Sequence, residues 1–345
     1  FMQFIKPGIN IDFIGKRKIA FVLSLVMILI SIGSLVINRG PRYGIDFAGG
    51  TLVQVKFEAP VTIDGIKSGL QNMELAASAV QQFGQAEDNE YLIRTDATTT
   101  AMEGLSEKIE QYLKEATDVP VEIRRVEMVG PQVGEDLREK ALFAMFYAML
   151  FITVYISGRF ELKWAKSAVV AAAIMGAVYL LSLFNVSVPF LMLAALIVSL
   201  VIFWFFEFKY AMGAIVALIH DVTITIGIFS IFDKEFTLPI VAALLTIIGY
   251  SLNDTIIVFD RIRENLRKYH KEPLATILNK SINETLSRTI LTSLTTLVVV
   301  VSLFVLGGGI IHDFSFALLV GILVGTYSSI FVATPILLAW QTRRK

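Results

Sequence analysis

The stretch I-A-F-V-L-S-L-V-M-I-L-I-S-I-G-S-L-V-I, residues 19–37, contains no charged side chain. As a helix rising 1.5 Å per residue it is about 28 Å long, close to the hydrocarbon thickness of a bilayer. A cleaved signal peptide is the alternative, but its apolar region is usually shorter, and no A-x-A cleavage site precedes the next segment. We therefore expect a retained first transmembrane helix.

Seven further apolar stretches follow this first one, which makes about eight expected spans. Hydrophobic residues form 55% of the chain. The stretches are residues 141–157, 167–184, 186–206, 210–232, 236–259, 289–306 and 314–340. The chain is therefore predicted to be a polytopic α-helical membrane protein.

Composition argues against several functional classes. The formal net charge is zero, so no charge excess indicates nucleic acid as a partner. The chain has no cysteine, and its histidines, His220, His270 and His312, lack the spacing of a metal motif. No Walker loop or Ser-His-Asp set is present. We expect no metal, no cofactor other than an ion gradient, and no hydrolytic enzyme.

Basic residues indicate how the chain is oriented. Lys and Arg cluster before the first span and after the last one, so the positive-inside rule places both termini in the cytoplasm. The other basic residues lie in loops that are separated from one another by two membrane crossings, so these loops fall on the same, cytoplasmic side. These basic positions are Lys6, Lys16, Arg17, Lys18, Arg159, Lys163, Lys166, Lys209, Arg261, Arg263, Arg267, Lys268, Lys271, Arg343, Arg344 and Lys345.

The only long polar segment lies between the first two spans and holds 17 acidic and 10 basic residues from Arg39 to Arg138. Its pattern predicts a βαββαβ order, typical of a ferredoxin-like α+β domain, on the extracytoplasmic side. The expected strands are 51–57, 77–83, 91–94 and 121–128, and the expected helices are 63–71 and 101–115. The expected organisation is a cytoplasmic N-terminus (1–18), the first span (19–37), this domain (38–138) and a helical bundle (139–345) with a basic cytoplasmic loop at 260–288.

Two acidic residues fall deep inside apolar spans. These are Asp221, which follows His220, and Asp254, which follows Asn253. An ionised carboxylate at the bilayer centre costs about 2.5 to 3.5 kcal/mol on insertion scales, so such residues need a reason. One reading is that each carboxyl hydrogen-bonds a neighbouring helix and holds the bundle together. The other, which we favour, is proton coupling.

Proton coupling requires a carboxyl whose surroundings change. Desolvation favours the neutral form of a carboxyl and a nearby cation favours the charged form. Arg288, at the entrance of the next span and one turn before Thr292, is the expected cation, although it could simply anchor the helix at the headgroups. Asp260 and Arg261 are only secondary candidates for this role. Alternating charges at the end of a helix usually form a face that is exposed to solvent.

Small residues recur in the last span. Gly321 and Gly325 form a G-x-x-x-G pattern, with Ser328 and Ser329 one turn further along. This pattern lets two membrane helices approach closely, and we read it as packing.

Longer strings carry a family resemblance. They are Y-G-I-D-F-A-G-G at 43–50, V-G-P-Q-V-G-E-D-L-R at 129–138, G-Y-S-L-N-D-T-I-I-V-F-D-R-I-R-E-N at 249–265, S-I-N-E-T-L-S-R-T at 281–289, T-S-L-T-T at 292–296 and G-T-Y-S-S at 325–329. In these the chain resembles the SecF family of the resistance-nodulation-division superfamily, over nearly its whole length.

This resemblance implies a half-transporter of the bacterial inner membrane. It would pair with SecD and the SecYEG channel, and with an accessory protein of the YajC type, to draw exported unfolded polypeptide outward with the proton motive force. It also implies that Asp254, Arg288 and Thr292 carry the proton coupling. Two other functions stay open: half of a drug or lipid exporter of the same superfamily, and a non-catalytic scaffold of the translocon.

One feature departs from the six spans that the resemblance implies. The string F-E-L-K-W-A-K-S-A-V-V-A from Phe160 returns as F-E-F-K-Y-A-M-G-A-I-V-A from Phe206, 46 residues later. The first copy has Ile174 and Met175 where the second has His220 and Asp221. We expect residues 160–206 to be an inserted, duplicated hairpin at the periphery of the bundle.

Overall fold

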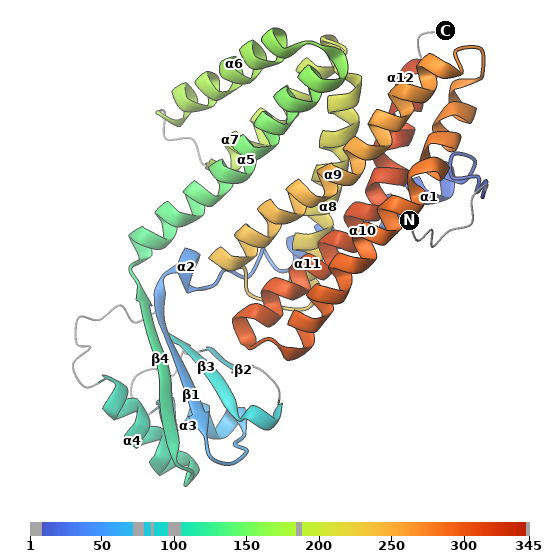
Figure 1. The fold of residues 1–345 in the computed structure, drawn as a ribbon. Coiled ribbons are helices and arrows are strands. Elements are labelled where there is room, and N and C mark those ends of the chain that lie inside the picture. The colour runs from blue at the N-terminus through green and yellow to red at the C-terminus, as the bar shows by residue number, and fades with distance from the viewer. Residues whose placement is uncertain (1–8, 72–78, 84–85, 96–104, 184–187, 343–345) are drawn as a thin grey trace.

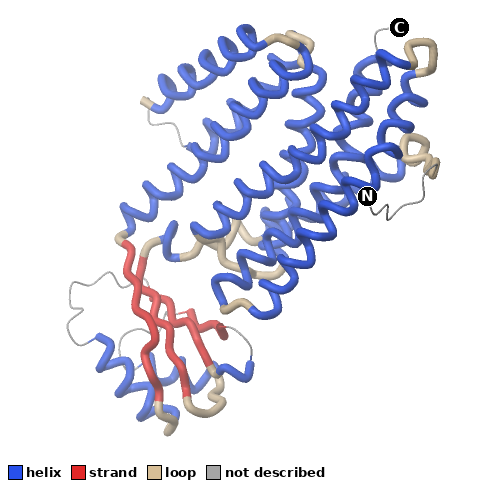
Figure 2. Tube along the Cα trace, in the orientation of Figure 1, coloured by secondary structure: helices blue, strands red, loops and turns tan. Residues whose placement is uncertain are grey.

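The computed structural model describes residues 9–71, 79–83, 86–95, 105–183 and 188–342. A bundle of long helices carries a small mixed domain, built on one sheet, at one end (Figures 1 and 2). The predicted fold class, a polytopic helical membrane protein with a small α+β domain, is confirmed.

The bundle is built from helices that follow the predicted apolar stretches. Seven stretches among the described residues are long and apolar enough to cross a membrane, and α7, where we expected an eighth, has a shorter described apolar part, Phe190–Phe205. The helices are α1 (Arg17–Ile37), α5 (Pro131–Glu161), α6 (Trp164–Ser182), α7 (Val188–Phe205), α8 (Lys209–Ile231), α9 (Leu238–Lys268), α10 (Leu274–Leu306) and α11 (Gly309–Ser328), which continues through the π-helical η2 (Ser329–Ala333) into α12 (Thr334–Thr342).

The small domain has one antiparallel sheet in the order β2-β3-β1-β4. Together with two helices this is the predicted ferredoxin-like arrangement. Alternate residues of β1, among them Val53 and Val55, are fully buried against the helices, as expected for a sheet covered on one face. The elements are β1 (Gly50–Phe57), α3 (Ile63–Gln71), β2 (Ala79–Phe83), η1 (Ala86–Asp88), β3 (Glu90–Thr95), α4 (Leu105–Thr117) and β4 (Val121–Val129).

Most boundaries of the small domain lie within two residues of the expected ones. The first residues of the predicted strand 77–83 and of the predicted helix 101–115 lie outside the described residues. The domain ends earlier than expected, because α5 begins at Pro131 rather than after residue 138. Proline suits the first turn of a helix, where its missing N–H has no partner to lose.

The segment 260–288 is not a loop, which corrects our prediction. Its first part continues α9 to Lys268 and its second part belongs to α10, which begins at Leu274. The reason lies in buried apolar positions among the charges: Phe259 and Ile262 on α9 pack in one core with Leu278 and Ile282 on α10. The charged residues therefore lie on the outer faces of an amphipathic helical hairpin.

The duplicated hairpin, helices α6 and α7, lies at the edge of the bundle, as predicted. Helix α6 packs on α5 and α7, with Ile174 and Val178 buried against Phe146 and Leu150 of α5. Figure 1 places α6 on the side of α5 that faces away from α9, α10 and α11. In the first copy of the repeat, Ile174 is therefore part of an apolar core, whereas the equivalent position in the second copy is His220.

Candidate functional site

Helix α9 runs through the centre of the bundle and positions Asp254. The side chain is 1% exposed, and its Oδ2 atom lies 3.5 Å from the hydroxyl of Ser293 on α10. Its Oδ1 atom has no hydrogen-bond partner among the described residues. Ser293 in turn is 2.7 Å from the hydroxyl of Thr326 on α11. A buried carboxyl with one long hydrogen bond is incompletely satisfied, which is costly unless something else completes it.

Helix α10 carries the other two predicted coupling residues. Arg288 is exposed and forms no ion pair with Asp254 in the described part of the chain. Thr292 is half-buried, and the hydroxyl of Thr289 is buried without a partner there. Asp254 and Arg288 therefore lie on neighbouring helices, and they form no ion pair among the described residues.

Asn253 points to the outside of the chain rather than into the bundle. It shares an exposed face of α9 with Ala242, Thr246 and Gly249, at the spacing i, i+4, i+7, i+11. All four are small or polar. The outward face of α1, by contrast, carries large apolar groups at Val22, Leu29 and Val36. A small and polar face on a membrane helix permits close approach of another helix and hydrogen bonds to it.

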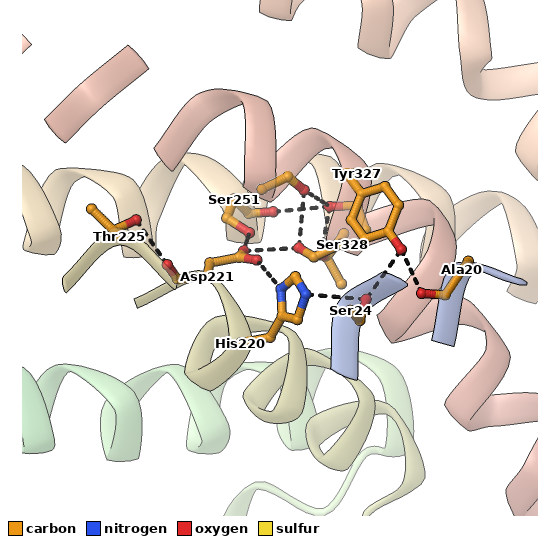
Figure 3. Close-up of polar contacts among 11 residues, drawn as sticks. Ala20, Ser24, His220, Asp221, Thr225, Ser251, Tyr327 and Ser328 are labelled. Atoms are coloured by element: carbon orange, nitrogen blue, oxygen red, sulfur yellow. Dashed lines mark hydrogen bonds and ion pairs between the residues drawn. The ribbon is translucent and has the colours of Figure 1, made fainter. Parts of the chain in front are cut away.

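The second predicted carboxylate, Asp221, sits in a different setting (Figure 3). It is fully buried, with its Oδ1 atom 2.9 Å from Nδ1 of His220. Its Oδ2 atom accepts hydrogen bonds from Ser251 on α9 at 2.6 Å and from Ser328 on α11 at 2.8 Å. Both carboxylate oxygens therefore have partners.

The network around Asp221 continues to the first helix. The Nε2 atom of His220 is 3.2 Å from the hydroxyl of Ser24 on α1, which is 3.1 Å from the hydroxyl of Tyr327 on α11. Tyr327 donates to the carbonyl of Ala20 at 2.7 Å. Four helices, α1, α8, α9 and α11, thus meet in one chain of hydrogen bonds (Figure 3). The arrangement resembles the first of our two readings, a carboxyl that joins helices.

Sequence reasoning missed Ser24, Ser251 and Tyr327 as members of this network. Single serines inside apolar spans are common, and nothing in their local sequence marks a distant partner. The predicted close packing at Gly321 and Gly325 is confirmed: a Cβ atom at Gly321 would lie 2.3 Å from Ile247, and one at Gly325 would lie 2.9 Å from Ser251. This close approach is what brings Ser328 to Asp221.

The secondary candidates Asp260 and Arg261 lie at the far end of α9. Asp260 pairs with Arg159 at 2.6 Å, and Arg261 pairs with Glu264 at 2.9 Å. All four side chains are substantially exposed. This agrees with the expectation of a solvated, structural set of charges. Among the described residues, no group of three or more His, Cys, Asp or Glu side chains could hold a metal ion.

Comparison with known proteins gives the family. The model of the protein export membrane proteins SecD/SecF, C-terminal, matches residues 108–197 and 174–343, and the SecD/SecF GG motif matches residues 34–61. The chain belongs to the SecD/SecF family. The two matches to one model overlap at residues 174–197, inside the repeated hairpin, as a duplication would produce.

Curated relatives of this family match the chain end to end. The protein translocase subunit SecF of Magnetococcus marinus is 45% identical over 350 residues, covering 100% of this chain and 97% of the relative. That of Calditerrivibrio nitroreducens is 41% identical over 349 residues, covering 100% and 99%.

Solved structures of the SecD/SecF family agree with the fold. The crystal structure of SecDF, a translocon-associated membrane protein from Thermus thermophilus, is 30% identical with a TM-score of 0.70, covering 97% of this chain and 39% of that one. SecDF in its super-membrane-facing form is 31% identical with a TM-score of 0.59, covering 100% and 40%. The chain thus spans about two fifths of the SecDF chains that it matches.

Proposed function

We propose that the protein is a subunit that uses the proton motive force to promote export of unfolded polypeptide through SecYEG, in the bacterial inner membrane. The observation that carries this proposal is the buried, half-satisfied carboxyl of Asp254. A group with an unfilled acceptor position can gain a proton or an external partner without breaking an existing network. Moving one charge through the membrane potential supplies about 2.3 kcal/mol per 100 mV.

A partner protein completes the site in this proposal. The exposed face of Ala242, Thr246, Gly249 and Asn253 is suited to a second membrane helix, and Arg288 is exposed nearby on α10. An arginine that forms no ion pair among the described residues fits a site that receives a carboxylate from another chain. SecD is the partner we propose, because the solved SecDF chains are more than twice as long as this one. An accessory protein of the YajC type would bind elsewhere.

The proposed orientation places the sheet domain outside the cytoplasm and both termini inside it. Basic residues lie in or beside three connections, α5–α6, α7–α8 and α9–α10, at the end of the bundle opposite the sheet (Figure 1): Lys163 in the first, Lys209 at the start of α8, and Lys271 in the third. Lys163 donates to the carbonyls of Phe206 and Glu207, so two of these connections touch. A basic cluster on one side of a bilayer supports a cytoplasmic assignment.

Asp254→Asn tests this function. In membrane vesicles with SecD and SecYEG, the variant should assemble normally and lose the stimulation of export by a proton gradient. Arg288→Lys should lose only part of it, because lysine keeps the charge but not the planar fork of donors. Asp260→Asn, on the same helix but in a solvated ion pair, is the matched control and should keep the stimulation.

Two results would contradict the proposal. Normal stimulation in Asp254→Asn would favour the non-catalytic scaffold. Unchanged export together with increased small-molecule susceptibility of a deletion strain would favour the small-molecule or lipid exporter.

A further inference from the structure

The short helix α2 (Ile45–Ala48) and its flanks, residues 43–50, join the sheet domain to the bundle at three places. Figure 1 shows α2 where β1 leaves the bundle, next to the start of α5. We call residues 43–50 the clasp. The proton-coupling proposal assigns no role to them.

The first contact of the clasp is with the start of α9. Gly44 donates its N–H to the carbonyl of Phe236 at 2.9 Å, Phe236 donates to the carbonyl of Arg42 at 2.7 Å, and Tyr43 pairs with Phe236 as a parallel bridge. The Asp46 carboxylate accepts the N–H of Leu238, the first residue of α9, at 2.8 Å. Thr237, the residue that precedes α9, makes no side-chain cap, so Asp46 provides the cap from another element.

The second contact is with α5. Helix α2 packs on α5 so closely that a Cβ atom on Gly134 would lie 3.0 Å from the backbone of Gly49. Gly49 has φ of +74°, and a Cβ there would lie 2.8 Å from Pro131. Only glycine fits this combination of a left-handed backbone and a backbone-to-backbone approach. The clasp is therefore held rigidly just before β1 begins at Gly50.

The third contact reaches the sheet itself. Arg94 on β3 donates to the carbonyl of Tyr43 at 2.6 Å and pairs with Glu235, in the α8–α9 connection, at 3.5 Å. Phe236 is buried against Phe47, with ring centroids 6.0 Å apart. The α8–α9 connection, the clasp and the sheet are thus fastened to one another by hydrogen bonds, an ion pair and an aromatic contact.

We propose that the clasp transmits movement of α9, which carries Asp254, to the sheet domain, with Asp46 as the positioning residue. A shift of α9 moves Leu238 and Phe236, and these move residues 43–50, which continue without a break into β1. The carboxylate of Asp46 lies at the positive end of α9 and holds it by charge as well as by hydrogen bond. This inference deepens the proposed function and rests on it.

A distance measurement tests the coupling. The chain has no cysteine, so cysteines introduced at Lys114 on α4 and Val305 on α10, both exposed, carry the spin labels alone. In the full-length protein in lipid, Asp254→Asn, a neutral mimic of the protonated site, should shift the distance between the labels. In an Asp46→Ala background the same substitution should produce no shift. Asp46→Asn, which keeps an acceptor for Leu238, should restore it.

Asp64→Ala is the matched control, because Asp64 is an exposed first-turn residue of α3 in the same domain. It should leave the shift intact. Survival of the shift in Asp46→Ala, or its absence when only Asp254 is changed, overturns the inference. A third outcome separates the two proposals. If the distance shift depends on Asp46 but export is the same with and without Asp254→Asn, the role of the clasp is supported and the proton-driven function is refuted.

Discussion

Two buried carboxylates in the bundle have opposite surroundings. Asp221 on α8 has partners on both oxygens, and glycines let the neighbouring helices touch. Asp254 on α9 has one oxygen without a partner among the described residues, and the neighbouring outward face of α9 is small and polar. Equal burial therefore does not mean equal role. A fully paired carboxylate fixes helices in place, whereas an incompletely paired one can exchange its partner.

The largest expected difference comes from removing each carboxylate in turn. Asp221→Ala removes the partner of the Ser251 hydroxyl and of Nδ1 of His220, while Ser328 can still donate to the carbonyl of Gly325, and each buried group left unpaired costs about 1–3 kcal/mol. Asp254→Ala removes a group that is poorly paired already. Thermal unfolding of the purified chain should show a large loss of stability for Asp221→Ala and little or none for Asp254→Ala. Equal losses of stability in the two variants would contradict the difference in pairing between the two carboxylates.

The two faces of α9 should respond differently to an added methyl group. At Gly321, which packs on α9, a Cβ would overlap Ile247 at 2.3 Å, and overpacking costs about 1–3 kcal/mol. At Gly249 a Cβ meets nothing within 4 Å. We expect Gly321→Ala to lower the unfolding temperature of the isolated chain. Gly249→Ala should not lower it, but should weaken copurification of SecD; normal copurification would remove this face from the proposed interface.

A smaller difference is expected between two serines. Ser251 donates to the Asp221 carboxylate at 2.6 Å, while Ser293 lies 3.5 Å from Asp254. A hydrogen bond weakens as its length increases, and an ordinary one contributes about 0.5–1.5 kcal/mol. Denaturation in detergent should therefore rank Ser251→Ala as the less stable variant. The reverse order would mean that Asp254 is held more firmly than its geometry indicates.

The sequence was sufficient to predict the spans, the sheet domain and the two carboxylates. Hydropathy and alternation are local patterns, and Asp221 and Asp254 stand out because charge inside apolar runs is rare. It did not separate the roles of the two, because that depends on how the helices rotate against each other. Ser24 and His220 are 196 residues apart, and their contact follows from the packing of α1 on α8.

Two further features needed the structure. Charge density at 260–288 suggested a loop, but spaced apolar residues such as Phe259 and Leu278 make it a packed helical hairpin. The Y-G-I-D-F-A-G-G string carried the family resemblance, yet its contact with Leu238 could not be foreseen, because a cap supplied by a distant side chain leaves no local pattern.

Infrared difference spectroscopy of the complex with SecD, between acidic and alkaline buffer, distinguishes whether Asp254 or Asp221 exchanges a proton. We expect a protonated-carboxyl band that disappears in Asp254→Asn and persists in Asp221→Asn. A band that persists in Asp254→Asn, or that disappears in Asp221→Asn alone, would contradict this expectation.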